Sequence, residues 1–194
     1  PLVCFGGWEM VLVGAACVLF CFLYTTLLAQ HGMGDVLVLL FFGLVPVCLT
    51  YYVTMPPASQ TITAQVVWAS LACGLVIDTL LVVNNYRDYD QDRAVGKKTL
   101  IVRMGRERAE QLYGWLGNIA TYMMWGCLVL GDSSFVLMLL CFACFVPYAL
   151  LHGATRVQMR RIGRGRELNK VLGMTARNMF VFGVTTAIVT LFIL

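Results

Sequence analysis

Long apolar stretches separated by short polar segments dominate the chain. A membrane-spanning helix needs about 20 mostly apolar residues. The stretches that meet this requirement are Trp8–Leu28, Asp35–Met55, Ala64–Val83, Leu112–Leu130, Phe135–Leu151 and Met174–Leu194. The pattern therefore predicts an all-α fold, a polytopic membrane bundle of six transmembrane helices that forms a single domain over residues 1–194.

The composition supports this class. Hydrophobic residues make up 60% of the chain and charged residues 12%, and the mean hydropathy is +0.80. Soluble domains are about half apolar and about a quarter charged, so these charges are too few to cover a soluble surface. We expect the lipid bilayer to be the main partner and expect no nucleic acid, and the pattern leaves the oligomeric state open.

The basic residues give the predicted bundle one orientation. All 14 Lys and Arg residues lie in the connections Asn84–Gln111 and His152–Gly173 or just beyond them, at Arg177. Because Lys and Arg concentrate in cytoplasmic loops, we expect both connections to face the cytoplasm. His31 and His152 then lie at the cytoplasmic edge, where we expect surface groups.

An acidic motif marks the cytoplasmic end of the third predicted span. Asn84, Asp88 and Asp92 are spaced by four residues, so on a helix that continues to Asp92 they fan over about 80° of one face. Mg²⁺ prefers oxygen ligands and is commonly held by one or two carboxylates together with substrate phosphates. Basic side chains that could neutralise a diphosphate lie in the same segment. A solvated, salt-bridged helix end accounts for the spacing equally well.

The same segment resembles a known family. From Asn84 to Gly105 it carries Asn84-Asn85, Arg87-Asp88, Asp92, Gly96-Lys97, Thr99-Leu100, Val102-Arg103 and Gly105. This run is similar to the second aspartate-rich motif of the UbiA family of intramembrane prenyltransferases, and specifically of its menaquinone branch, the 1,4-dihydroxy-2-naphthoate polyprenyltransferases. The segments Gly32-Met33-Gly34-Asp35 and Gly165-Arg166-Glu167-Leu168-Asn169 are weaker echoes of the same branch.

The resemblance implies a larger fold than six helices. Family members have nine helices and two aspartate-rich motifs, and the six spans here align with the last six of the nine. The orientation independently indicates an odd number of upstream spans, because the first predicted span begins outside the cell and a chain that starts there without a signal is hard to insert. We therefore expect the chain to be N-terminally truncated, to carry half of the metal site, and to be inactive by itself.

The resemblance also implies a reaction. Two Mg²⁺ ions would hold the diphosphate of a polyprenyl donor, and a carbon of 1,4-dihydroxy-2-naphthoate would attack the allylic cation with loss of the carboxylate. The expected metal ligands are Asn84, Asp88 and Asp92. Asp88, Asp92 and Asp35 are the expected catalytic residues. The substrate contacts are expected from Asn84, Arg87, Lys97, Lys98, Arg103 and Tyr24.

Other interpretations remain open at this point. Asp35 could merely favour a helix N-terminus, and Tyr24 could be an ordinary interfacial tyrosine. Asp78 lies within the third span and is expected to face the bundle interior, where an acidic residue is a functional candidate. A transporter or membrane subunit, an inert remnant, or a prenyltransferase for another aromatic quinone precursor would also carry such residues.

Overall fold

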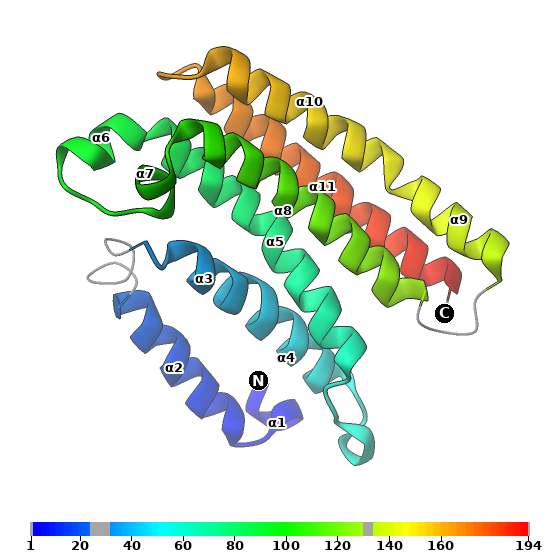
Figure 1. The fold of residues 1–194 in the computed structure, drawn as a ribbon. Helices are drawn as coiled ribbons and strands as arrows, with labels where there is room; N and C mark the ends of the chain where they lie inside the picture. Colours follow the sequence, from blue (N-terminus) through cyan, green and yellow to red (C-terminus); the bar gives the residue numbers. More distant parts are fainter. Residues whose placement is uncertain (1, 24–31, 130–133, 194) are drawn as a thin grey trace.

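The structure, a computed structural model, describes residues 2–23, 32–129 and 134–193. Every regular element in these ranges is a helix (Figure 1), which confirms the all-α prediction. The helices are α1 (Leu2–Gly6), α2 (Glu9–Leu23), α3 (Gly34–Val38), the π-helix η2 (Leu39–Leu44), α4 (Val45–Thr54), the 3₁₀-helix η3 (Pro57–Ser59), α5 (Ala64–Arg87), α6 (Tyr89–Ala94), α7 (Leu100–Met104), α8 (Arg106–Val129), α9 (Phe135–Cys144), α10 (Val146–Ile162) and α11 (Leu168–Ile193).

Four helical runs among the described residues are long and apolar enough to cross a membrane. They are Gly34–Thr54, Ala64–Arg87, Phe135–Ile162 and Leu168–Leu191. The other two predicted spans are also helical. The apolar helix α2 ends at Leu23, and the rest of its predicted span lies outside the described residues. The 24-residue helix α8 begins with a charged turn and is less apolar overall.

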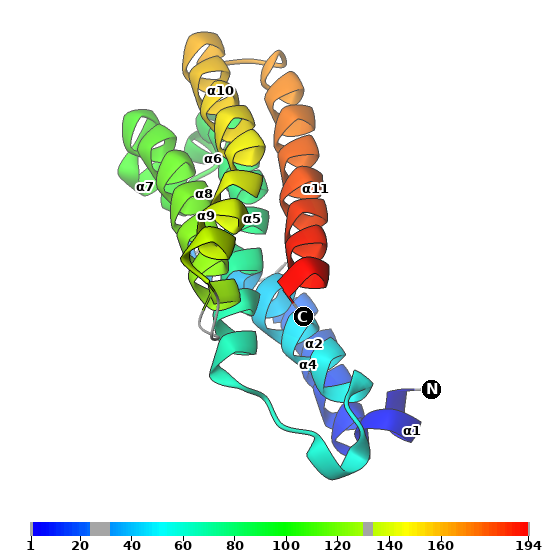
Figure 2. The same cartoon turned by 90° about the vertical axis from the view of Figure 1, so that its right-hand side faces the viewer.

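Helix α5 is the centre of the bundle (Figures 1 and 2). It packs against α8, against η2 and α4, and against α11. The contact with η2 is close, because a Cβ on Gly43 would lie 2.6 Å from the Cα of Gly74 and 2.8 Å from the carbonyl oxygen of Ser70. Small residues permit such approaches between membrane helices, and the π-helical turn η2 marks the same place.

A buried aromatic group joins α8 to α10. His152 is 3% exposed, and its ring stacks on Tyr113 at 4.4 Å and on Tyr148 at 5.6 Å between ring centres. Its Nε2 lies 2.9 Å from the Tyr113 carbonyl oxygen, which accepts the hydrogen bond. The prediction that His152 is a surface group is therefore wrong, because its helix continues to Ile162 and turns this residue inward. His31 lies outside the described residues.

Candidate functional site

The cytoplasmic end of α5 positions the first part of the predicted motif. Helix α5 ends at Arg87, and Asp88 takes φ −87° and ψ 4°, outside regular helical geometry. The backbone N–H of Asp88 still donates to the Asn84 carbonyl at 3.1 Å, and that of Asp92 to the Asp88 carbonyl at 2.8 Å. A separate short helix, α6, starts at Tyr89. The continuous helix to Asp92, on which the shared face of the three side chains depended, is therefore not formed, because α5 and α6 are separate helices.

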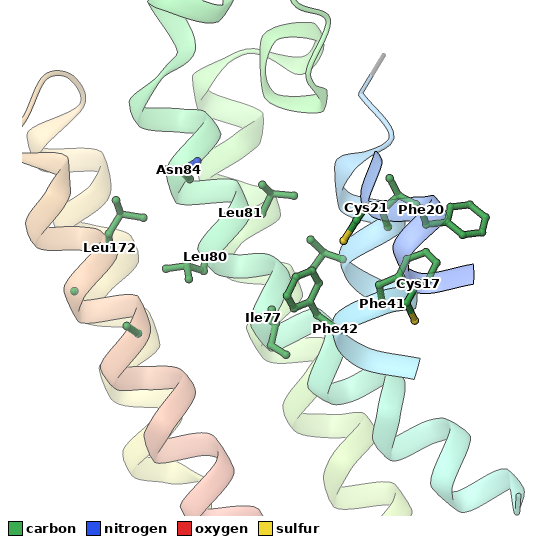
Figure 3. A pocket seen from close by; sticks show the side chains of 14 residues that line it. Cys17, Phe20, Cys21, Phe41, Phe42, Ile77, Leu80, Leu81, Asn84 and Leu172 are labelled. Carbon is green, nitrogen blue, oxygen red and sulfur yellow. The ribbon is translucent and has the colours of Figure 1, made fainter. Parts of the chain in front are cut away.

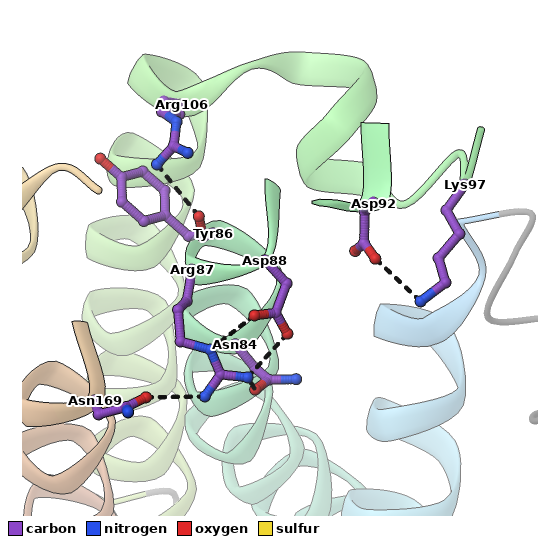
Figure 4. Close-up of polar contacts among 8 residues, drawn as sticks. All are labelled: Asn84, Tyr86, Arg87, Asp88, Asp92, Lys97, Arg106 and Asn169. Atoms are coloured by element: carbon purple, nitrogen blue, oxygen red, sulfur yellow. Dashed lines mark hydrogen bonds and ion pairs between the residues drawn. The ribbon is translucent and has the colours of Figure 1, made fainter. Parts of the chain in front are cut away.

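Asn84 and Asp88 meet at one guanidinium group (Figure 4). Arg87 Nε and Nη2 donate to the two carboxylate oxygens of Asp88 at 2.7 and 2.8 Å. Nη2 also donates to Asn84 Oδ1 at 2.8 Å, and Nη1 to Asn169 Oδ1 at 3.0 Å. Asn169, from the first turn of α11, was not among the predicted site residues, although its segment was one of the weaker echoes. The guanidinium therefore gathers oxygens from two helices that are distant in sequence.

Asp92 lies apart from this group and has its own partner. Its carboxylate is 3.0 Å from Lys97 Nζ, and its side chain is nearly buried whereas that of Lys97 is half exposed. The pair forms because Gly96, at φ +74°, lets the chain reverse after α6. The left-handed region favours glycine because it has no Cβ. The structure therefore brings Asn84 and Asp88 together, and it pairs Asp92, on α6, with Lys97 in the connection that follows (Figure 4).

Arg106, which the sequence reasoning left among the basic residues, organises this end of the bundle. Its Nη1 donates to the carbonyl oxygens of Tyr86 and Gly163, and its Nη2 donates to Asp90 Oδ2 at 2.9 Å. The guanidinium carbon also lies 4.8 Å from the centre of the Tyr89 ring. One cation thus ties α5, α6 and the α10–α11 turn together.

The remaining predicted residues take different places. Lys98 is exposed, and its backbone carbonyl packs against Gly32 at the entrance to α3. Arg103 lies in the last turn of α7. Asp35 lies in the first turn of α3, as expected from the sequence. Tyr24 falls outside the described residues.

Two buried carboxyl groups, Asp35 and Asp78, lie at matching levels where α3 packs on α5. The two helices are antiparallel, and Leu39 contacts Gly74 between them. Asp35 and Asp78 each lie about one helical turn closer to the cytoplasmic end than these two residues. They are 8% and 2% exposed, and they lie within electrostatic range of each other. Both oxygens of Asp35 and Oδ1 of Asp78 lack a hydrogen-bond partner within the described ranges. The prediction that Asp78 faces the interior is confirmed.

An apolar cavity opens beside Asn84 (Figure 3). Its volume is 790 Å³, and α2, α3, η2, α5 and α11 all contribute to its wall. Phe20, Phe41, Ile77 and Leu172 are among the apolar side chains on this wall, and Asn84 is its polar residue at the cytoplasmic end. The arrangement suits a long hydrocarbon chain with a polar group at one end.

The oxygens of the motif suit a hard cation. Asn84 Oδ1 and both Asp88 oxygens already converge on a cationic group, the guanidinium of Arg87, and Asp92 already accepts from an ammonium group. Amide and carboxylate oxygens are also the donors that Mg²⁺ takes in phosphate sites. No group of three His, Cys, Asp or Glu side chains within the described ranges could hold a metal ion alone. These residues therefore fit a metal shared with a phosphate better than an all-protein metal cage.

The chain is similar to one known family and to several of its members. Residues 2–170 match the UbiA prenyltransferase family. The chain is 34% identical over 187 residues to the 1,4-dihydroxy-2-naphthoate octaprenyltransferase of Mycobacterium tuberculosis, covering 92% of this chain and 58% of the relative. The Mycobacterium leprae protein of the same name is 33% identical, with the same coverage. The Escherichia coli protein of that name is 36% identical over 85 residues, which is 44% of this chain and 26% of the relative. No solved structure matches.

Proposed function

Because the chain belongs to the UbiA prenyltransferase family, we propose that the full-length protein transfers a polyprenyl group from its diphosphate to an aromatic acceptor. The proposed acceptor is 1,4-dihydroxy-2-naphthoate, in menaquinone biosynthesis. This rests on the names of relatives of which the chain spans 58%. The observation that carries the proposal is the apolar cavity that ends at Asn84, beside the Arg87–Asp88 pair.

The proposed position of the donor follows from the different chemistry of its two ends. The hydrocarbon chain would lie in the 790 Å³ apolar cavity, because burial of apolar surface drives such binding. The diphosphate would lie at the cytoplasmic end, where Arg87 and Lys97 can exchange their present carboxylate partners for phosphate oxygens. Arginine matches phosphate geometry with two parallel N–H groups. Lys98 and Arg103 are further basic groups of the same segment.

Asn84, Asp88 and Asp92 would hold Mg²⁺ at this end. The ion supplies positive charge that stabilises the departing diphosphate. Movement of Arg87 and Lys97 onto the phosphates would free the carboxylates of Asp88 and Asp92 for the metal. The ion pairs seen in the structure thus keep the acidic groups neutralised until the donor arrives.

The acceptor would bind near Asp35 at the start of α3. Its carboxyl has no hydrogen-bond partner in the described part of the chain, so it is available to orient an aromatic hydroxyl or to accept its proton. Tyr24 is the proposed aromatic wall of this acceptor site. With the basic connections on the cytoplasmic side, the site would face the cytoplasm of the bacterial cell.

Product analysis tests this proposal. Membranes that contain the full-length protein are incubated with octaprenyl diphosphate, Mg²⁺ and either 1,4-dihydroxy-2-naphthoate or 4-hydroxybenzoate. We expect a prenylated, decarboxylated naphthol and no prenylated benzoate. Prenylation of the benzoate alone would move the protein to another branch of the family. Absence of both products, in membranes where the protein is folded, would contradict prenyl transfer.

A further inference from the structure

A second groove lies between α8 and α10, away from the candidate site. The two helices pack side by side (Figures 1 and 2). The groove has a volume of 790 Å³ and is lined by Glu107, Glu110, Gln111, Gly153, Arg156, Val157 and Arg160. None of these residues was assigned a role in prenyl transfer. Charged side chains therefore gather at the end of this helix pair that carries the basic connections.

The side chain of one arginine, Arg156, is held in this groove by contacts with the backbone of α8. Arg156 Nε donates to the Glu110 carbonyl oxygen at 2.9 Å. Its guanidinium lies over Gly114, where a Cβ would come within 2.9 Å of Nη1. Because the bond to this carbonyl uses Nε, the terminal amino groups can bind an anion in the groove. Arg160, 82% exposed, is the second cation and lies 3.8 Å from Glu110 Oε2.

The groove also contains negative charge. Glu110 accepts from the Tyr86 hydroxyl at 2.8 Å, whereas Glu107 is exposed on the first turn of α8. Two arginines and two glutamates give the groove no net charge. A ligand with both a phosphate and an ammonium group complements this arrangement better than an anion alone, because each of its charges finds an opposite one.

Apolar side chains continue the groove toward the middle of the helices. Leu150 and Val157 on α10 are 69% and 67% exposed, and Tyr122 on α8 is 60% exposed. Leu150, Gly153 and Val157 follow the i, i+3, i+7 spacing of one helix face. A Cβ on Gly153 would meet nothing within 4 Å, so the face is open. A charged end joined to an apolar strip matches a phospholipid.

We propose that the α8–α10 groove binds a zwitterionic phospholipid with a primary ammonium group from the surrounding leaflet. Arg156 and Arg160 bind its phosphate, Glu107 binds its ammonium, and its acyl chains lie along Leu150 and Val157. The site is separate from the proposed transferase site. Its occupancy is independent of the proposed function.

Native mass spectrometry tests the site. The full-length protein is released from nanodiscs that contain phosphatidylethanolamine, phosphatidylglycerol and phosphatidylcholine in equal amounts, and the retained lipid is identified. We expect phosphatidylethanolamine to be enriched. The double variant Arg156→Gln, Arg160→Gln should lower its retention about tenfold or more, because charge-assisted hydrogen bonds are lost. The matched control Arg161→Gln, Arg164→Gln changes neighbouring exposed arginines that do not line the groove, and should retain the lipid.

A charge reversal separates a specific site from general attraction. Glu107→Lys changes an exposed residue, so the fold should survive, and the preference should shift from phosphatidylethanolamine to phosphatidylglycerol. Equal retention of all three lipids, or an unchanged preference in Glu107→Lys, would overturn the proposal. Displacement of phosphatidylethanolamine by free phosphoethanolamine at a concentration similar to that of the lipid would also overturn the proposal. The groove would then bind the soluble headgroup as well as the lipid, and the acyl chains would contribute nothing.

Discussion

Because Gly43 and Gly74 are in close contact, we expect that any side chain added at Gly43 will force η2 and α5 apart and lower the stability of the protein. In Gly43→Ala, the new methyl group would lie 2.6 Å from the Gly74 Cα and 3.0 Å from its nitrogen. Carbon atoms in contact are normally about 3.5–4.0 Å apart, so the helices would have to move by about 1 Å. All three nearest neighbours, which include the carbonyl oxygen of Ser70 at 2.8 Å, are backbone atoms and cannot rotate away. We expect a loss of about 1–3 kcal/mol in the free energy of unfolding, the usual cost of overpacking.

Unfolding in mixed micelles measures this effect. The purified protein in dodecylmaltoside is titrated with sodium dodecyl sulfate, and helix loss is followed by circular dichroism. Gly183→Ala on α11 is the matched control, because a Cβ there meets nothing within 4 Å. It should be neutral or stabilising by up to about 1 kcal/mol, since alanine is the better helix former. Equal midpoints for Gly43→Ala and Gly183→Ala would refute the close-contact reasoning.

Three further substitutions test other parts of the structure. His152→Ala removes two ring contacts and a buried hydrogen bond and should cost about 2–4 kcal/mol in the same unfolding assay, whereas a surface histidine would cost almost nothing. Asp78→Asn replaces a buried carboxyl group that has an unpartnered oxygen with an amide that cannot ionise. It should raise the unfolding midpoint, because the amide never brings a negative charge into the apolar interior; a lower midpoint would contradict this. Arg106→Ala should raise the protease sensitivity of α6 and α7, and Arg106→Lys should raise it equally, because an ammonium group cannot reproduce the planar contacts of the guanidinium. Normal protease resistance in Arg106→Lys would contradict this.

The helical class and the place of the motif could be predicted from the sequence. Apolar stretches of sufficient length fix which segments can span a membrane, and the four-residue spacing correctly brought Asn84 and Asp88 together. Asp78 was correctly placed inside from its angular position on the helix that carries the motif. These features depend on the composition and period of single helices.

Features that depend on neighbouring helices could not be predicted in this way. The break at Asp88 separates the Asp92 side chain from that of Asp88, and the reversal at Gly96 brings Lys97 to Asp92. Helical spacing alone contains neither turn. Asn169 reaches Arg87 across 82 positions of sequence, which only the packing of α11 against α5 determines. His152 was misplaced for the same reason, because its burial depends on α8.

The rate of prenyl transfer by aspartate variants tests the central claim most directly. In the full-length protein, Asp88→Asn should lower the rate of 1,4-dihydroxy-2-naphthoate prenylation about 100-fold or more, because the charge facing the metal–diphosphate is lost. Asp90→Asn, two residues away, changes a side chain that is 63% exposed, and Arg106 keeps its hydrogen bonds to the carbonyl oxygens of Tyr86 and Gly163. The rate should therefore stay within about twofold. An unchanged rate in Asp88→Asn, or equal losses in both variants, would contradict the proposed diphosphate site.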